Sequence, residues 1–185
     1  MKKRIIGIAL LTVSSILLFA WGDRVNQPDE DPTEAYYESI KDKDGFCIKD
    51  GILYAYLGKD KEITIPETVT EIYNSALSGD FGHGANLKKV IVPGTVKKIN
   101  GGAFAFTSAK KIIVEEGVKE IGEWAFGDSY IEEIWFPASL EKIGNRIMET
   151  EEGLDGTKIH VPKNSEISQY FEQNMPYGNA ELIYD

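Results

Sequence analysis

The side chains that most often do chemistry in proteins are scarce in this sequence. Histidine occurs twice, at His83 and His160, and cysteine once, at Cys47. A zinc site normally uses three or four His or Cys ligands, and these three residues are spread over distant segments. A cysteine nucleophile needs a neighbouring base, and no histidine is close to Cys47 in the sequence. We expect no zinc centre, no cofactor and no catalytic thiol. Cys47 is interpreted as a half-buried small hydrophobic residue or, alternatively, as the partner in an intermolecular disulfide.

Acidic residues offer two weak suggestions of a metal or acid–base site. The aspartates of segment 42–50 resemble the start of a calcium loop, but such a loop needs glutamate at its twelfth position. If Asp42 is the first position, Leu53 occupies the twelfth. Glu151–Glu152 is a carboxylate pair, but adjacent loop residues usually face solvent. The sequence therefore predicts a protein that is not an enzyme and binds no metal.

The dominant pattern is instead a short repeat that fills the middle of the chain. Four copies begin at Glu62, Lys89, Lys111 and Glu133, and a fifth, partial copy (KIHVP) begins at Lys158. The fixed isoleucines of the four copies are 27, 22 and 22 residues apart, at Ile72, Ile99, Ile121 and Ile143. A period in the twenties is typical of a solenoid, in which each repeat packs on its neighbours.

Within a repeat, a short strand precedes a bend, a second extended run and a turn that leads back. Proline ends the strand in most copies, because it cannot donate to a β ladder. Alternation within the strands predicts which side chains point inward. The predicted inward ladders are Ile63/Val90/Ile112/Ile134/Ile159, Ile65/Val92/Val114/Phe136/Val161, Val69/Val96/Val118/Leu140, Ile72/Ile99/Ile121/Ile143, Ala76/Ala103/Ala125/Ile147 and Leu77/Phe104/Phe126/Met148.

The ends of the solenoid need caps, because a bare end would expose core and an unpaired strand edge. Before the repeats, Asp50-Gly51 between two β runs predicts a two-residue hairpin turn. After them, Ile167–Asn174 predicts a short helix and Glu181–Tyr184 a last edge strand. The predicted organisation is a signal peptide at 1–22, an acidic flexible linker at 23–44, a β-hairpin cap at 45–61, repeats at 62–164 and a C-terminal cap at 165–185.

The first 22 residues have the layout of an export signal. Met1–Arg4 is basic, Ile5–Trp21 is apolar, and small residues precede a cut after Gly22. An uncleaved membrane anchor is the alternative, although the apolar run is short for crossing the bilayer. We expect a secreted or cell-surface protein. Within the linker that follows, Glu34–Ile40 is a candidate short helix that could help to cap the first repeat.

Overall composition narrows the possible partners. The chain has 185 residues, is 42% hydrophobic and carries a formal net charge of −10. A nucleic-acid-binding protein needs a basic face, so nucleic acid is excluded as an expected partner. Adhesion to anionic membranes is disfavoured for the same reason, which leaves an uncleaved N-terminal segment as the one expected route to a membrane.

The repeats and the hairpin resemble the BspA-like leucine-rich repeats, a bacterial surface family. The similarity is carried by IxIPxxVxxIxxxAL from Ile63, VxVPxxVxxIxxxAF from Val90, IxVxxxVxxIxxxAF from Ile112 and the hairpin GFCIKDGILYAYLG. Glu115 in place of proline and Ile147-Met148 in place of Ala-Phe depart from the pattern. The resemblance implies an exported, parallel β-solenoid with an N-terminal hairpin cap and a C-terminal cap, often used for adhesion or protein binding. No ligand can be transferred from it.

Outward residues of the first strand in each repeat form the first candidate site. Ile91, Ile113 and Trp135 would make an exposed apolar stripe that continues at His160, with a charged rim of Lys89, Lys111 and Glu133. An apolar centre inside a charged rim is typical of protein interfaces. The alternative is that β-branched and aromatic residues simply suit strands and pair between repeats.

Two insertions form the second candidate site. Loop 78–86 is five residues longer than its equivalents, and loop 149–156 is three longer. Insertions in repeat proteins often map to one binding face, and Phe81 and His83 are the candidates in the first loop. A purely structural role for these loops is the alternative. The leading hypothesis is binding of a protein on a host or bacterial surface, and the alternative is carbohydrate binding through Trp135 and nearby tyrosines.

Overall fold

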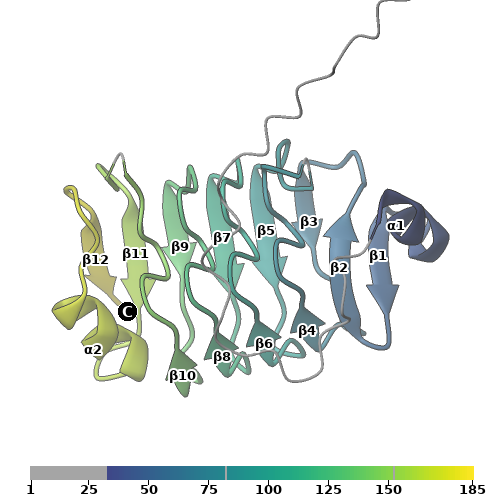
Figure 1. Cartoon of the computed structure of the whole chain (residues 1–185). Coiled ribbons are helices and arrows are strands. Elements are labelled where there is room, and N and C mark those ends of the chain that lie inside the picture. Colours follow the sequence, from purple (N-terminus) through teal and green to yellow (C-terminus); the bar gives the residue numbers. More distant parts are fainter. Residues whose placement is uncertain (1–32, 82, 152) are drawn as a thin grey trace, which may run out of the picture. The chain divides into compact units, whose positions relative to one another are not determined.

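Stacked short strands line two walls of a solenoid in the described residues (Figure 1). The structure, a computed structural model, describes residues 33–81, 83–151 and 153–185, which lie in the compact unit Pro32–Asp185. Sheet A has the order β1-β2-β4-β6-β8-β10, and sheet B has the order β12-β11-β9-β7-β5-β3. The predicted signal peptide, residues 23–32 of the predicted linker, Gly82 and Glu152 lie outside the described residues.

The strands are short, as expected for a solenoid that turns sharply at the end of each run. Sheet A contains β1 (Phe46–Lys49), β2 (Ile52–Tyr56), β4 (Glu71–Ile72), β6 (Lys98–Ile99), β8 (Glu120–Ile121) and β10 (Lys142–Ile143). Sheet B contains β3 (Glu62–Thr64), β5 (Lys89–Val92), β7 (Lys111–Val114), β9 (Glu133–Trp135), β11 (Lys158–Val161) and β12 (Glu181–Tyr184).

Parallel pairing aligns equivalent positions of successive repeats, as the sequence predicts. In sheet B the register places Ile63, Val90, Ile112, Ile134 and Ile159 in one buried row. In sheet A the fixed isoleucines align in the same way, although Ile143 at the end of the row is only partly buried. Like residues therefore stack at the strand spacing of about 4.8 Å and build one continuous core. The inner aromatic ladder includes Phe104 stacked on Phe126, with ring centroids 5.2 Å apart.

The turn after the fixed isoleucine has the same left-handed backbone in every repeat. Three residues after that isoleucine, φ is +57° at Ser75, +62° at Gly102, +56° at Trp124 and +52° at Arg146. Glycine occupies this position once, although it is the residue that adopts a positive φ at the lowest cost. The geometry of the whole repeat, rather than local residue preference, therefore holds these turns.

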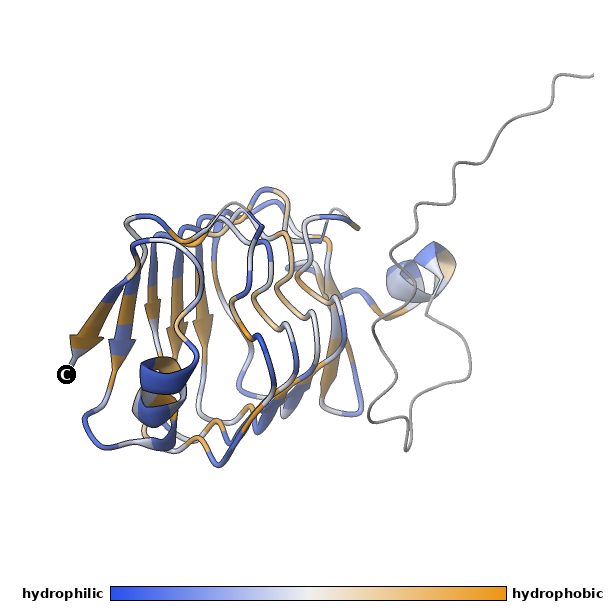
Figure 2. Cartoon of the chain, turned by 60° about the vertical axis from the view of Figure 1, so that its left-hand side comes forward, coloured by the Kyte–Doolittle hydropathy of each residue, from blue (hydrophilic) through white to orange (hydrophobic). Residues whose placement is uncertain are grey.

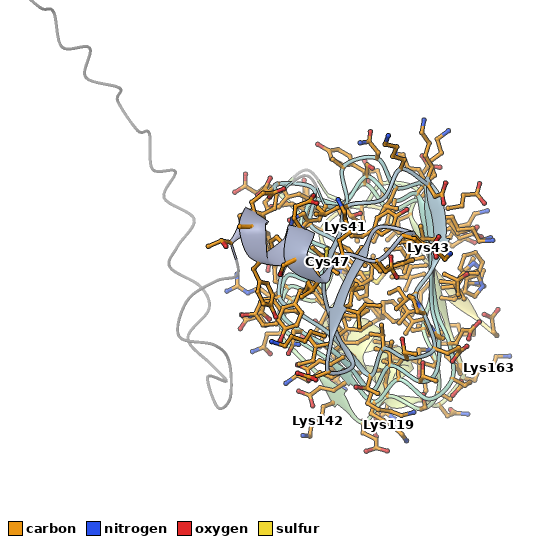
Figure 3. The ribbon with its side chains drawn as sticks, turned by 90° about the vertical axis from the view of Figure 1, so that its right-hand side faces the viewer. Lys41, Lys43, Cys47, Lys119, Lys142 and Lys163 are labelled. Atoms are coloured by element: carbon orange, nitrogen blue, oxygen red, sulfur yellow. The ribbon has the colours of Figure 1, made fainter. Side chains whose placement is uncertain are left out.

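A helix and the predicted hairpin close the N-terminal end. Asp50 and Gly51 both have positive φ, as a two-residue hairpin turn between β1 and β2 requires. Strand β2 then pairs with β4, so the hairpin extends sheet A beyond the first repeat. Helix α1 (Glu34–Ile40) lies inside the segment predicted as a linker. It is the short helix that the sequence suggested within that segment. Cys47 is fully buried beside this helix, and its thiol donates to the Tyr37 carbonyl (Figure 3).

The C-terminal end is closed by α2 (Glu166–Gln173) and β12. The hydroxyl of Ser165 accepts a hydrogen bond from the Ser168 amide and caps the N-terminus of α2. Helix α2 takes the place that a short strand of sheet A has in the earlier repeats. Phe171 is buried against Phe136, with ring centroids 5.6 Å apart. The rest of α2 is largely hydrophilic, as Figure 2 shows. Both predicted caps are therefore present.

Candidate functional site

One row of side chains points outward from the centre of sheet B. Strand register aligns Thr64, Ile91, Ile113, Trp135, His160 and Ile183. The row contains every residue of the predicted stripe. It also contains Ile183 of β12, which the sequence analysis did not assign to the row although it predicted the strand.

The stripe is less exposed than the sequence predicts. All four residues, Ile91, Ile113, Trp135 and His160, are half-buried, and none is among the exposed large hydrophobic residues. Neighbouring strands are only about 4.8 Å apart, so each large side chain covers part of the next. The row is therefore a closely packed outer surface rather than a set of projecting side chains.

Trp135 in particular is held between its neighbours on the two adjacent strands. The imidazole of His160, on β11, stacks on the indole with centroids 4.3 Å apart and an interplanar angle of 13°. From β7 the Lys111 ammonium lies 4.1 Å from the ring centroid, within the range of a cation–π contact. The ring of Trp135 is thus engaged within the sheet and has little free face.

Charged groups beside this ring form a chain of contacts across three strands. The Glu133 carboxylate lies 3.4 Å from Lys111 Nζ and 3.2 Å from His160 Nε2. Desolvation by burial raises the pKa of Glu133, but hydrogen bonds from His160 and Lys111 and the charge of Lys111 outweigh it and lower the pKa overall. The Asp185 carboxylate lies 3.4 Å from His160 Nδ1, without the geometry of a hydrogen bond.

The remaining rim residue, Lys89, differs from its neighbours. It aligns with Glu62 on one side and with Lys111 on the other. Lys111 is already paired with Glu133, and two lysines directly opposite each other repel. No ion pair involves Lys89 in the part of the chain that the structure describes. Lys89 is therefore the rim cation with the most to gain from an acidic partner.

The two candidates in the first long loop differ in how exposed they are. The side chain of Phe81 is 68% exposed, whereas His83 is buried and packs edge-on against Tyr37 with centroids 5.1 Å apart. Burial lowers the pKa of His83, which favours the neutral imidazole. The prediction that His83 lies on an accessible surface is wrong, because the loop folds its histidine inward.

Two exposed tyrosines on the segments that lead back into sheet B were not predicted from the sequence. Tyr130 and Tyr177 are 59% and 81% exposed, and they lie in these return segments, as does Phe81. Strand alternation says nothing about irregular segments, so the inward–outward argument could not find them. The available signal was the presence of large aromatic residues next to glycine, serine and aspartate.

Comparison with known protein families identifies the family of this chain. The family described as "BspA type Leucine rich repeat region" matches residues 52–176 in six copies. The chain belongs to the BspA-type leucine-rich repeat family. The six copies cover the repeats together with part of the hairpin and all of α2, so the family match spans most of the continuous core described above.

Other comparisons add little to this BspA-type assignment. Among solved structures, "The Crystal structure of Pneumococcal vaccine antigen PcpA" aligns with 14% identity and a TM-score of 0.42. The alignment covers 78% of this chain and 45% of the antigen, so the chain spans less than half of that protein. No curated protein matches the sequence.

Neither metal-binding nor membrane-spanning elements occur in the described part of this BspA-type chain. Within residues 33–81, 83–151 and 153–185, three or more His, Cys, Asp or Glu side chains nowhere converge as metal ligands would. In the same residues, neither helix combines the length and the apolar character that crossing a bilayer requires.

Proposed function

We propose that this protein is an exported, non-enzymatic binding scaffold that attaches to a protein on a host or bacterial surface. Membership of a leucine-rich repeat family supports the scaffold role, since such solenoids offer extended surfaces built from repeated strands. The basic and apolar N-terminal residues support export. The proposed contact surface is the outer face of sheet B, centred on Ile91, Ile113 and Trp135.

The observation that carries this proposal is the unbroken outward row on sheet B. Ile91, Ile113 and Trp135 form an apolar centre in register, and Lys89, Lys111 and Glu133 run beside them on the same strands. An interface of this kind gains affinity from the apolar centre and specificity from the rim. Because each row is fixed by strand pairing, the surface needs no rearrangement before it binds.

The engaged state of Trp135 favours a protein over a saccharide on this face. A sugar that stacks on tryptophan needs an open ring face, and His160 and Lys111 already contact this ring. A protein partner can instead pack over the whole row and pair with the rim charges. We therefore place protein binding first and retain no saccharide site at Trp135.

The test is capture of surface proteins with the immobilised full chain, followed by affinity measurements on the captured protein with purified variants. Trp135→Ala should weaken binding roughly tenfold or more, as expected for a truncated aromatic at the centre of an interface. Lys89→Glu should slow association and change its salt dependence. Lys98→Ala, on the opposite sheet, is the matched control and should bind like the wild type. Equal affinities of folded Trp135→Ala, Lys89→Glu and wild type would exclude this face.

A further inference from the structure

A hollow of about 470 Å³ opens beside the return segments of the third and fourth repeats. It lies between the segment around Tyr130 and residues 150–151 and 153–157 of the long loop, and its walls include Phe106, Lys110 and Glu132. Its size is within the range of ligand pockets in proteins, roughly 300–1,000 Å³. These walls belong to the return segments and not to the outward row of sheet B.

The long loop forms one wall of this hollow. In the sheet register, Ile134 and Ile159 are 25 residues apart, whereas Ile112 and Ile134 are 22 apart, so three extra residues enter before β11. The loop is held in place by Leu154. Leu154 is buried in the core and its amide donates to the Tyr177 carbonyl at 2.9 Å.

Side-chain carboxylates fix the same loop to its neighbours. The Asp128 carboxylate accepts from the Glu151 amide at 3.0 Å, and Asp155 Oδ1 accepts from the Asn179 amide at 2.7 Å. These bonds join the loop to the preceding return segment and to the C-terminal segment. Hydrogen bonds thus hold residues on both sides of the loop to their neighbours, which reduces the entropy cost of binding.

Two exposed tyrosines flank the loop. Tyr130 lines the hollow, and its amide donates to the Thr107 carbonyl at 3.1 Å, so its backbone is fixed while its ring stays in solvent. Tyr177 lies on the far side of the loop, against Gly153. Exposed tyrosine is enriched at binding surfaces because a rigid ring supplies contact area at a small entropy cost.

The ring of Tyr130 already accepts a cation. Lys110 Nζ lies 5.8 Å from its centroid and 3.1 Å from Glu132 Oε1, so one ammonium contacts both the ring and a carboxylate. The hollow also contains Asp128, Glu151 and Asp155, against this single lysine. The carboxylate of Glu151 has no ion pair or hydrogen bond within the described residues. The hollow therefore carries more negative than positive side chains, next to the ring of Tyr130.

We propose that this hollow binds a lysine- or arginine-bearing segment of a partner protein. The cationic side chain would contact the exposed part of the Tyr130 ring, which Lys110 leaves open, and would approach Glu151. The rest of the segment would run along the loop toward Tyr177. Ring and carboxylate together recognise a cation better than either alone. The proposal concerns a different surface from the outer face of sheet B and does not depend on that face binding anything.

A saccharide is the main competing occupant, since it too can stack on exposed tyrosine. A neutral sugar can donate hydrogen bonds to these carboxylates but carries no charge that offsets theirs, whereas a basic segment also gains charge attraction from each unpaired carboxylate. The two also respond differently to salt, because charge attraction weakens as ionic strength rises. The charge of the lining therefore favours the basic segment.

The test uses the purified full chain and three probes: an unstructured Lys/Ser peptide, the same peptide with Glu in place of Lys, and a panel of neutral oligosaccharides. Calorimetric titration at low and high salt measures binding. The Lys/Ser peptide should bind, more weakly at high salt, and the Glu/Ser peptide should not. Tyr130→Ala and Glu151→Gln should each reduce affinity by about three- to tenfold, the loss expected for one cation–π or charge contact. Both residues are outside the core, so thermal unfolding should be unchanged.

Matched controls separate this hollow from the face of sheet B. Phe81→Ala removes an exposed aromatic elsewhere in the return segments, and Trp135→Ala alters the other proposed surface, so both should bind the peptide like wild type. The proposal is overturned if the two peptides bind equally or if Tyr130→Ala and Glu151→Gln leave affinity unchanged. Binding of a saccharide alone, lost in Tyr130→Ala, would also overturn it. Failure of the Trp135→Ala test in surface capture would leave this result unaffected.

Discussion

The imidazole of His160 lies almost parallel to the indole of Trp135, with ring centroids 4.3 Å apart. Trp135 on β9 and His160 on β11 are aligned neighbours, so the stacking links the last full repeat to the partial repeat that follows. Strand β11 of that partial repeat also pairs with β12. Glu133 contacts the same imidazole from the start of β9. Near the C-terminal end of sheet B, side-chain contacts between β9 and β11 therefore add to the backbone hydrogen bonds that pair these strands.

The acid response of the protein should depend on Glu133. Its pKa is lower in the folded chain than its ordinary value, so its stabilising effect is present above that ordinary value and is lost as pH falls through the lowered one. Replacing it by Gln should lower the melting temperature near neutral pH. The difference from wild type should shrink on acidification from about pH 6 to about pH 3.

Circular dichroism melts at a series of pH values measure this effect. Glu67→Gln is the matched control, because Glu67 is exposed and has no ion pair among the described residues. A difference between wild type and Glu133→Gln that stays constant across this pH range would contradict the assigned role of the carboxylate.

Core stability should depend strongly on the aromatic ladder. Phe104 is fully buried and stacks on Phe126 in the next repeat. Phe104→Ala removes a large side chain from a packed row and should cost about 3–5 kcal/mol of unfolding free energy. Urea unfolding followed by circular dichroism gives this value. Phe81→Ala, at an exposed position, should change it by about 0.5 kcal/mol or less. Similar losses in the two variants would mean that the ladder is not the core.

The thiol of Cys47 should be chemically inert in the folded protein. Burial is the main reason that the pKa of Cys47 is raised to about 11, so the group stays protonated at ordinary pH, and the reactive form is the thiolate. At about pH 8, alkylation by iodoacetamide should be at least roughly 100-fold slower in the native than in the urea-unfolded chain. Mass spectrometry of timed samples measures both rates. Rapid native modification would place Cys47 at an accessible surface and revive the intermolecular disulfide.

The repeated core was predictable from the sequence because the same physical constraint acts on each repeat. Inward residues such as Val90 and Ile112 must be apolar, and strand alternation fixes which they are. The hairpin was predictable from Asp50-Gly51, because two positive φ values in succession suit few residue pairs. These features follow from local rules that recur in each copy.

The surface details were not predictable, because they depend on side-chain packing between copies. Alternation places Trp135 outward, but only the structure shows that His160 and Lys111 contact its ring. Similarly, the length of loop 78–86 indicates an irregular segment without saying that His83 turns inward. The exposure of Tyr130 follows from the path of an irregular return segment, to which no periodic rule applies.

Close packing of successive turns should make Gly144 intolerant of even one added carbon. A Cβ at this position would clash with the Glu123 amide nitrogen and would lie 2.6 Å from the Gly122 carbonyl carbon. Both atoms are backbone, so neither can move without shifting the preceding repeat. Gly144→Ala should therefore destabilise the protein by about 1–3 kcal/mol, the range seen when packed sites are overfilled.

Gly101 supplies the comparison that isolates this clash. It lies in the equivalent turn of an earlier repeat, and a Cβ there would meet only the Glu123 carbonyl oxygen, at 3.1 Å. Neither glycine has a positive φ, so alanine suits the backbone of both and the two variants differ mainly in what the new carbon meets. Thermal unfolding should show a clearly larger loss for Gly144→Ala than for Gly101→Ala. Equal losses would mean that the cost comes from the backbone and not from contact between repeats.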